Sequence, residues 1–99
     1  MTCPAYRRAT FVAVPEISRF FGIVVVMYYD DHPPPHFHVR YGEHRAILEI
    51  ESAVMLFGEL PPRVLGMVVE WATAHRAELD ANWSCARVQA PLTPIPPLE

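Results

Sequence analysis

Residues 30–42 read Asp-Asp-His-Pro-Pro-Pro-His-Phe-His-Val-Arg-Tyr-Gly, and this segment decides the fold of the chain. Its three prolines fix φ and remove three N–H donors, so they cannot lie inside a sheet and must bridge two strands. After the prolines, polar and apolar residues alternate, as they do in a strand with one buried face. The polar face carries His36, His38 and Arg40, while the other face is apolar.

The apolar runs on either side of the prolines predict the rest of the sheet. Ile23 to Tyr29 is continuously apolar and β-branched at first, which is typical of a central strand. His36 to Tyr41 is the next strand, and Gly42-Glu43 is a two-residue turn with glycine first. Arg45 to Glu51 then returns as a third strand, and Val54 to Phe57 is a short fourth strand.

The two-residue turn also fixes which residues face each other in the second and third strands. It places His36 opposite Glu49 and Arg40 opposite Arg45, with His38 between these two pairs. Arginines that face each other repel unless an anion lies between them. The polar face is therefore the candidate functional face.

Residues 63–87 have apolar side chains at spacings of three and four, which predicts one long helix with room for a bend near Ala74-His75. The fold class that follows is α+β. Residues 14–88 would form a three- or four-stranded, mainly antiparallel sheet with this helix packed on one face. Residues 1–13 are expected to be an N-terminal extension, either disordered or an artefact of start-codon choice. The proline-rich residues 89–99 are expected to form a strap over the surface.

Length and composition fit one globular domain, with 99 residues of which 52% are hydrophobic and 19% charged. The formal charge of −3 argues against a generally basic nucleic-acid surface but leaves room for a local basic patch. No apolar run approaches the roughly 20 residues that cross a bilayer, and no secretory signal is recognisable. We therefore expect a cytoplasmic protein without a membrane partner.

Four segments resemble a known family: Val14-Pro-Glu-Ile-Ser-Arg-Phe-Phe-Gly-Ile, residues 28–42, Gly58-Glu-Leu-Pro-Pro-Arg, and Glu70-Trp71 through Asn82-Trp83. They are similar to the small bacterial domain-of-unknown-function family forty-one sixty, over about residues 14–98. Its members typically start with Met-Pro where this chain has Val14-Pro15. The resemblance implies a toxin–antitoxin-like gene pair in which this chain is the toxin and a small partner protein is encoded nearby. It implies no settled biochemistry.

The polar face suggests cleavage of RNA. Two imidazoles with pKa values near 6.5 can share the two proton transfers of phosphodiester cleavage, and Arg40 would neutralise the charge on phosphorus. Glu49 would orient His36, and the neighbouring Arg40 should lower the pKa of His38. A metal-independent endoribonuclease is thus the first hypothesis. Its catalytic candidates are His36, His38, Arg40 and Glu49, and its additional candidates are His32, Asp30, Asp31 and Arg45.

Two other functions stay open, so the sequence does not decide whether the chain is an enzyme. His36 and His38, two apart on a strand, could present metal ligands, with His32 as the expected third and an acidic residue as a further completion. No second cluster of Cys or His exists, so no cofactor is favoured. The other alternative is a non-catalytic module that binds the small partner protein. The apolar helix stripe with Trp71 and Trp83 predicts a homodimer or such a complex.

Overall fold

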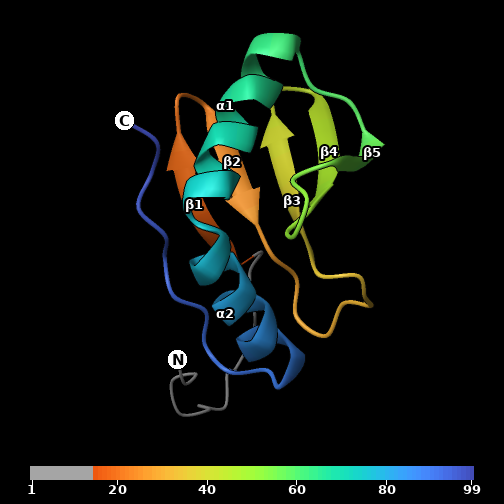
Figure 1. Ribbon diagram of the computed structural model, residues 1–99, viewed down its shortest axis with the longest axis vertical. Helices are drawn as coiled ribbons and strands as arrows, with labels where there is room; N and C mark the ends of the chain where they lie inside the picture. The colour runs from red at the N-terminus through yellow and green to blue at the C-terminus, as the bar shows by residue number, and fades with distance from the viewer. Residues whose placement is uncertain (1–14) are drawn as a thin grey trace.

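The computed structural model describes residues 15–99, which form a five-stranded sheet with two helices on one face (Figure 1). The strands are β1 (Glu16–Phe20), β2 (Ile23–Val26), β3 (His36–Tyr41), β4 (His44–Glu49) and β5 (Met55–Gly58). Each strand pairs antiparallel with the next along the chain, so their order in the sheet is β1-β2-β3-β4-β5. The expectation for residues 1–13 lies outside the described residues and stays a prediction.

The α+β class is confirmed, but the sheet has five strands where three or four were expected. The additional strand is β1, which pairs with β2 through Arg19 opposite Val24 and Phe20 opposite Ile23. The register shifts between Glu16 and Ser18, and this irregularity leaves the successive residues Ile17 and Ser18 both buried. A bulge of this kind hides the period of two by which a strand is recognised in a sequence.

The expected single long helix is approximate, because the helical segment is divided into α1 (Pro62–Ala74) and α2 (Arg76–Arg87) at His75, where the sequence left room for a bend. His75 separates them with φ −117° and ψ 27°. Its ring Nδ1 lies 2.8 Å from Oε1 of Glu78, which stands in the first turn of α2. A carboxylate at this place is favourable next to the positive end of a helix, so the contact stabilises a new helix start.

The core lies between the sheet and α1. Phe37 and Val39 of β3 and Leu48 of β4 are at most 1% exposed. Trp71 of α1 packs on this layer, with its ring centre 6.0 Å from that of Phe37 and 5.5 Å from that of Phe20. Residues 89–99 carry no helix or strand and run past β1, where Ile95 donates its N–H to the carbonyl of Ile17 at 2.8 Å (Figure 1).

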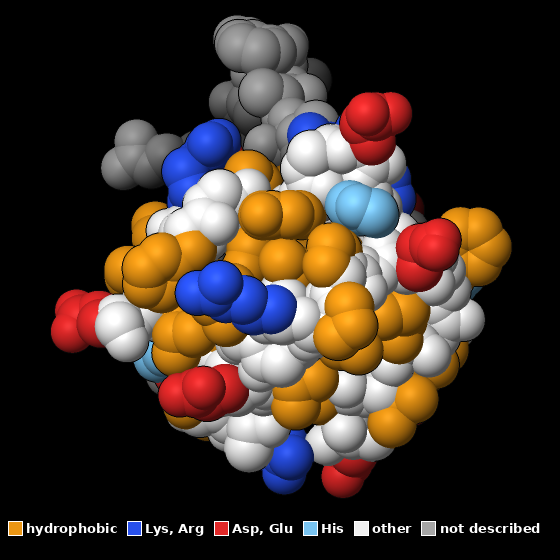
Figure 2. Space-filling model, turned by 90° about the horizontal axis from the view of Figure 1, so that it is seen from above, with side chains coloured by type: hydrophobic (Ala, Val, Ile, Leu, Met, Phe, Trp, Pro, Cys, Tyr) orange, Lys and Arg blue, Asp and Glu red, His pale blue; other side chains and the backbone are white. Residues whose placement is uncertain are grey.

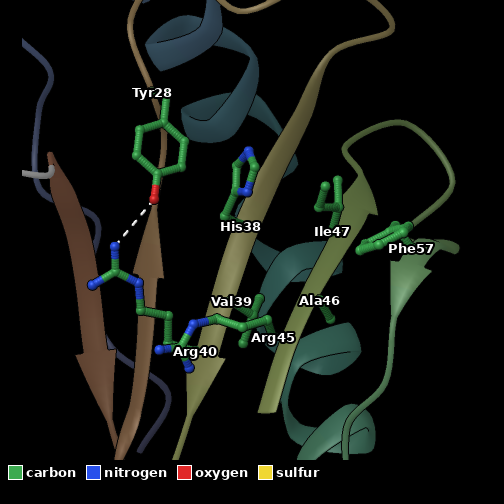
Figure 3. Close-up of a pocket in the computed structure, with 8 residues that line it drawn as sticks. All are labelled: Tyr28, His38, Val39, Arg40, Arg45, Ala46, Ile47 and Phe57. Carbon is green, nitrogen blue, oxygen red and sulfur yellow. Dashed lines mark hydrogen bonds between the residues drawn. The ribbon is translucent and has the colours of Figure 1, made fainter. Parts of the chain in front are cut away.

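The predicted pairing of β3 with β4 is confirmed: His36 faces Glu49, His38 faces Ile47, and Arg40 faces Arg45. Gly42 in the connecting turn has φ 57°, a left-handed conformation that glycine adopts without steric cost. This register turns the polar side chains of β3 away from α1. Within residues 15–99 no helix covers that face around His38 and Arg40 (Figure 3), whereas His36 at the start of β3 lies against Trp83 of α2. No described helix is both long and apolar enough to cross a membrane.

Candidate functional site

The loop between β2 and β3 carries an acidic side chain back over the start of β3. Asp30 adopts φ 57°, and its N–H donates to the carbonyl of Ala86 near the end of α2 at 3.1 Å. This bond fixes the loop to the helix. The next residue, Asp31, accepts the N–H of His32 at Oδ1 (2.9 Å), which directs Oδ2 toward the imidazoles of β3. The proline bridge that follows contains a cis peptide bond between Pro33 and Pro34.

Three side chains meet here, and we call them the Asp31–His36–His38 cluster. Oδ2 of Asp31 lies 2.9 Å from Nε2 of His36 and 3.3 Å from Nε2 of His38. His36 is only 5% exposed, and its ring centre is 5.2 Å from that of Trp83 in α2. The side chains of Asp31 and His38 keep 21% and 23% of their surface exposed. The cluster is therefore closed on the His36 side and open on the His38 side.

The hydrogen bonds of His36 determine where its proton lies. Nδ1 is 2.6 Å from the carbonyl oxygen of Pro34, and a carbonyl can only accept, so Nδ1 carries a hydrogen. A neutral imidazole has one N–H, so Nε2 of neutral His36 would present a lone pair to the carboxylate of Asp31. That arrangement is repulsive. Two electron-pair donors, Nε2 of His36 and Oδ2 of Asp31, thus face each other at 2.9 Å.

A cavity of about 400 Å³ adjoins the open side of the cluster (Figure 3). It is lined by Tyr28, His38, Val39, Arg40, Arg45, Ala46, Ile47 and Phe57. In Figure 3 the helices lie behind the sheet, and Tyr28, His38 and Arg40 stand on the side that faces the viewer. The cavity thus lies on the polar face of β3 and β4.

The two arginines of this cavity face each other across β3 and β4, and neither forms an ion pair with a carboxylate of residues 15–99. Nη2 of Arg40 donates to Oη of Tyr28 at 3.1 Å. Nη1 of Arg45 donates only to the carbonyls of Gly42 and His44, at 3.2 and 3.0 Å. By contrast, Arg19 on β1 is paired with Glu16 at 2.8 Å. The cavity therefore has two positive charges without a counter-charge.

His38 belongs to both the cluster and the cavity. Its ring stands edge-on to Tyr28, with centres 4.5 Å apart. Burial lowers the pKa of His38, and the nearby charges of His36 and Arg40 lower it further, while the bond to Asp31 opposes this. The predicted direction is confirmed, although burial is a larger cause than Arg40. The imidazole is consequently neutral at pH 7.

A family model described as Domain of unknown function (DUF4160) matches residues 22–84. The chain belongs to the DUF4160 family. The resemblance found in the sequence is thereby confirmed, and the match contains the whole cluster and both cavity arginines. No curated protein and no solved structure matches the chain.

In the structure of this DUF4160 chain, the candidates predicted from the sequence fall into separate groups. His36, His38 and Asp31 come together, and Arg40 and Arg45 line the cavity. Glu49 faces His36 in the register, but its carboxylate accepts the hydroxyl of Ser52, and Asp31 is the acid that meets the imidazole.

Two other candidates differ in their contribution. Asp30 contributes its backbone N–H to the loop. His32 is exposed, with its ring centre 6.0 Å from that of His36, and lies outside the cluster. Tyr28 and Phe57 also line the cavity but were not among the candidates predicted from the sequence. Phe57 lies opposite Ile47, next to an irregularity in the pairing of β4 with β5 that the sequence does not reveal.

Proposed function

We propose that this DUF4160 chain is the toxin-like component of a bacterial two-gene module and that it cleaves RNA on the uncovered face of its sheet. The observation that carries this proposal is the opposed pair Arg40 and Arg45, which has no carboxylate partner in residues 15–99. Opposed like charges destabilise a sheet. A phosphodiester between them would remove the repulsion, and guanidinium groups bind phosphate with two parallel hydrogen bonds.

The surroundings of the two arginines suit a single-stranded segment better than a duplex. Phe57 is 69% exposed at one side of the cavity, and Tyr28 stands at another. Exposed aromatic rings stack on unpaired bases, whereas a duplex hides its bases. The net charge of −3 also favours a short local contact over binding along an extended basic surface.

The cluster would supply the base of the reaction. The 2′-oxygen of the ribose attacks phosphorus and gives its proton to the neutral imidazole of His38, while the bond to the 5′-oxygen breaks and that oxygen takes a proton from solvent water. The products are a 2′,3′-cyclic phosphate and a 5′-hydroxyl. Arg40 and Arg45 neutralise the charge that develops on phosphorus. His38 connects the cluster to the cavity, whereas buried His36 has partners at both ring nitrogens and acts as a positioning residue.

The test compares growth arrest on induction with cleavage of a single-stranded RNA by the purified protein. The double variant Arg40→Ala/Arg45→Ala should bind RNA about 100-fold more weakly or worse, since each charge-assisted bond contributes roughly 1.5–3 kcal/mol. Arg63→Ala is the matched control, because Arg63 is an exposed arginine of α1 that does not line the cavity. A wild-type protein that arrests no growth and cuts no RNA contradicts the proposal.

A second function, binding of the small partner protein, is favoured by the exposed edge of the sheet. β5 is the terminal strand, and Val54, Leu56 and Phe57 are 55%, 47% and 69% exposed there. Figure 2 shows other hydrophobic side chains exposed on the upper end of the molecule, separated by charged ones. Leu56→Glu should abolish a complex with the neighbouring gene product in size-exclusion chromatography. A complex that forms equally well with this variant would show that β5 is not the binding surface for the partner protein.

A further inference from the structure

We infer that Asp31, His36 and His38 form a binding site for one divalent transition-metal ion, held by one carboxylate oxygen and two imidazole Nε2 atoms. The three ligand atoms lie within 4.8 Å of one another. His36 and His38 leave the same face of β3, and the loop bond between Asp30 and Ala86 brings Asp31 to them. The site is argued from this geometry alone, whereas its use in RNA cleavage rests on the proposed function.

Two of the three spacings match neighbouring ligands on one ion, and the two imidazole nitrogens lie within 4.8 Å of each other. Nitrogen and oxygen ligands about 2.1 Å from an ion are roughly 3.0 Å apart at right angles and roughly 3.4 Å apart in a tetrahedron. The carboxylate oxygen of Asp31 is 2.9 Å from one imidazole nitrogen and 3.3 Å from the other. An ion can therefore enter with small side-chain movements.

Hydrogen bonds have similar lengths, so the contact at the other ring nitrogen of His36 is the deciding observation. The bond from Nδ1 to the carbonyl of Pro34 leaves Nε2 as a lone-pair donor in the neutral ring. Metal-bound histidines commonly make this bond from the other nitrogen to a backbone carbonyl, which fixes the tautomer. Nε2 of His36, on a residue that is only 5% exposed, then faces Oδ2 of Asp31 at 2.9 Å with no hydrogen of its own to donate. A bound ion satisfies the same contact with a neutral ring.

The donor set selects the class of ion. Two imidazoles and one carboxylate suit zinc and other first-row transition metals, whereas magnesium and calcium prefer oxygen ligands alone. Three protein ligands leave at least one position for water, as in catalytic zinc sites. Because His38 also lines the cavity, that water would lie near a phosphodiester held by Arg40 and Arg45. A bound ion lowers the pKa of its water toward about 7, so a bound hydroxide could accept the 2′-hydroxyl proton and become water.

The experiment measures zinc binding directly, without RNA. Chelator-treated protein is titrated with Zn²⁺ by calorimetry, and cobalt binding is followed by its visible absorption. Wild type should take up about one equivalent. Asp31→Asn and His38→Gln should weaken binding by about 100-fold or more, since even changes to groups behind the ligands lower metal affinity 10–100-fold. His44→Gln is the matched control, because His44 lies outside the cluster at the start of β4 and should leave the affinity unchanged.

Removal of buried His36 can unfold the chain, so the two conservative variants carry the test, with circular dichroism as the check on folding. Folded wild type without stoichiometric uptake of Zn²⁺ or Co²⁺ overturns the site, as does equal affinity of Asp31→Asn and wild type. RNA binding by the same samples is measured separately. Zinc uptake without RNA binding supports the metal site and contradicts the proposed function. RNA cleavage at full rate by protein that takes up no zinc supports the proposed function and contradicts the metal site.

Discussion

The two faces of β3 are made by alternate residues of one six-residue strand, yet they are held in place by different forces. Phe37 and Val39 on one face are buried in the hydrophobic core, where the ring of Phe37 packs against Trp71. On the other face, His36, His38 and Arg40 each have a specific polar partner, namely Asp31 for both imidazoles and Tyr28 for the guanidinium. One face is held by the packing of apolar side chains, and the other by hydrogen bonds and charges. Substitutions on the two faces should therefore separate effects on stability from effects on activity.

The largest effect is expected on the core face. Phe37→Ala removes a fully buried ring that touches Trp71, and such truncations cost about 3–5 kcal/mol in cores. A loss of this size is comparable to the whole stability of a small domain. Chemical denaturation measures it. Arg40→Ala on the opposite face should cost less than about 1 kcal/mol. A Phe37→Ala variant as stable as Arg40→Ala would show that the core is not organised around this strand.

The next effect is a lower rate of RNA cleavage without a loss of folded structure. His38→Ala should lower the rate of RNA cleavage by about two to four orders of magnitude, the usual contribution of a positioned acid–base group or its equivalent. The side chain keeps 23% of its surface exposed, so circular dichroism should stay native. Glu49→Ala should reduce the rate far less, because its carboxylate binds Ser52 instead of the cluster. Equal losses for the two variants would restore Glu49 to the site.

The two faces also differ in how far the sequence predicts them. The register of β3 and β4 follows from one short turn and from the alternation of residues 36–41, both of which are local. The position of Asp31 depends on the hydrogen bond between Asp30 and Ala86. These two residues are far apart in sequence, and no pattern in the sequence predicts their contact. β1 was missed because its bulge conceals the alternation, and the break at His75 has no glycine or proline to mark it.

The polar face should make stability depend on pH in the absence of metal. The pKa of His38 is lowered in the folded chain, so between the ordinary value of 6.5 and the folded value the unfolded chain binds more protons. Stability therefore falls as pH decreases through this window. The pKa of Asp31 is also lowered: burial opposes the shift, but the bonds from His32 and the two imidazoles outweigh it. The protein should therefore lose stability a second time below about pH 3.8.

Thermal denaturation from pH 7.5 to 3 tests this expectation. His38→Gln should remove the first decrease and keep the second, whereas His44→Gln should keep both. An unchanged first decrease in His38→Gln would assign it to another group. Substitutions at Phe37 should lower the whole curve without changing its shape, because the core face carries no titrating side chain.

The smallest effect concerns the opposed arginines, and here stability and activity should move in opposite directions. Arg45→Gln removes one of two facing positive charges that lack a carboxylate in the described residues. Stability should rise by roughly 0.2–1 kcal/mol at low salt and by less at high salt, where the repulsion is screened. Affinity for RNA should fall about tenfold with the loss of one phosphate contact.

The matched control is Arg19→Gln. Arg19 is an exposed arginine of β1 that is already paired with Glu16, so its removal should not stabilise the protein and should leave RNA binding unchanged. Measurements of unfolding free energy at low and high salt, together with RNA binding, compare Arg45→Gln with this control. An Arg45→Gln variant that is less stable than wild type at low salt would mean that the pair is not under repulsion. The argument for an anion between Arg40 and Arg45 would then lose its support.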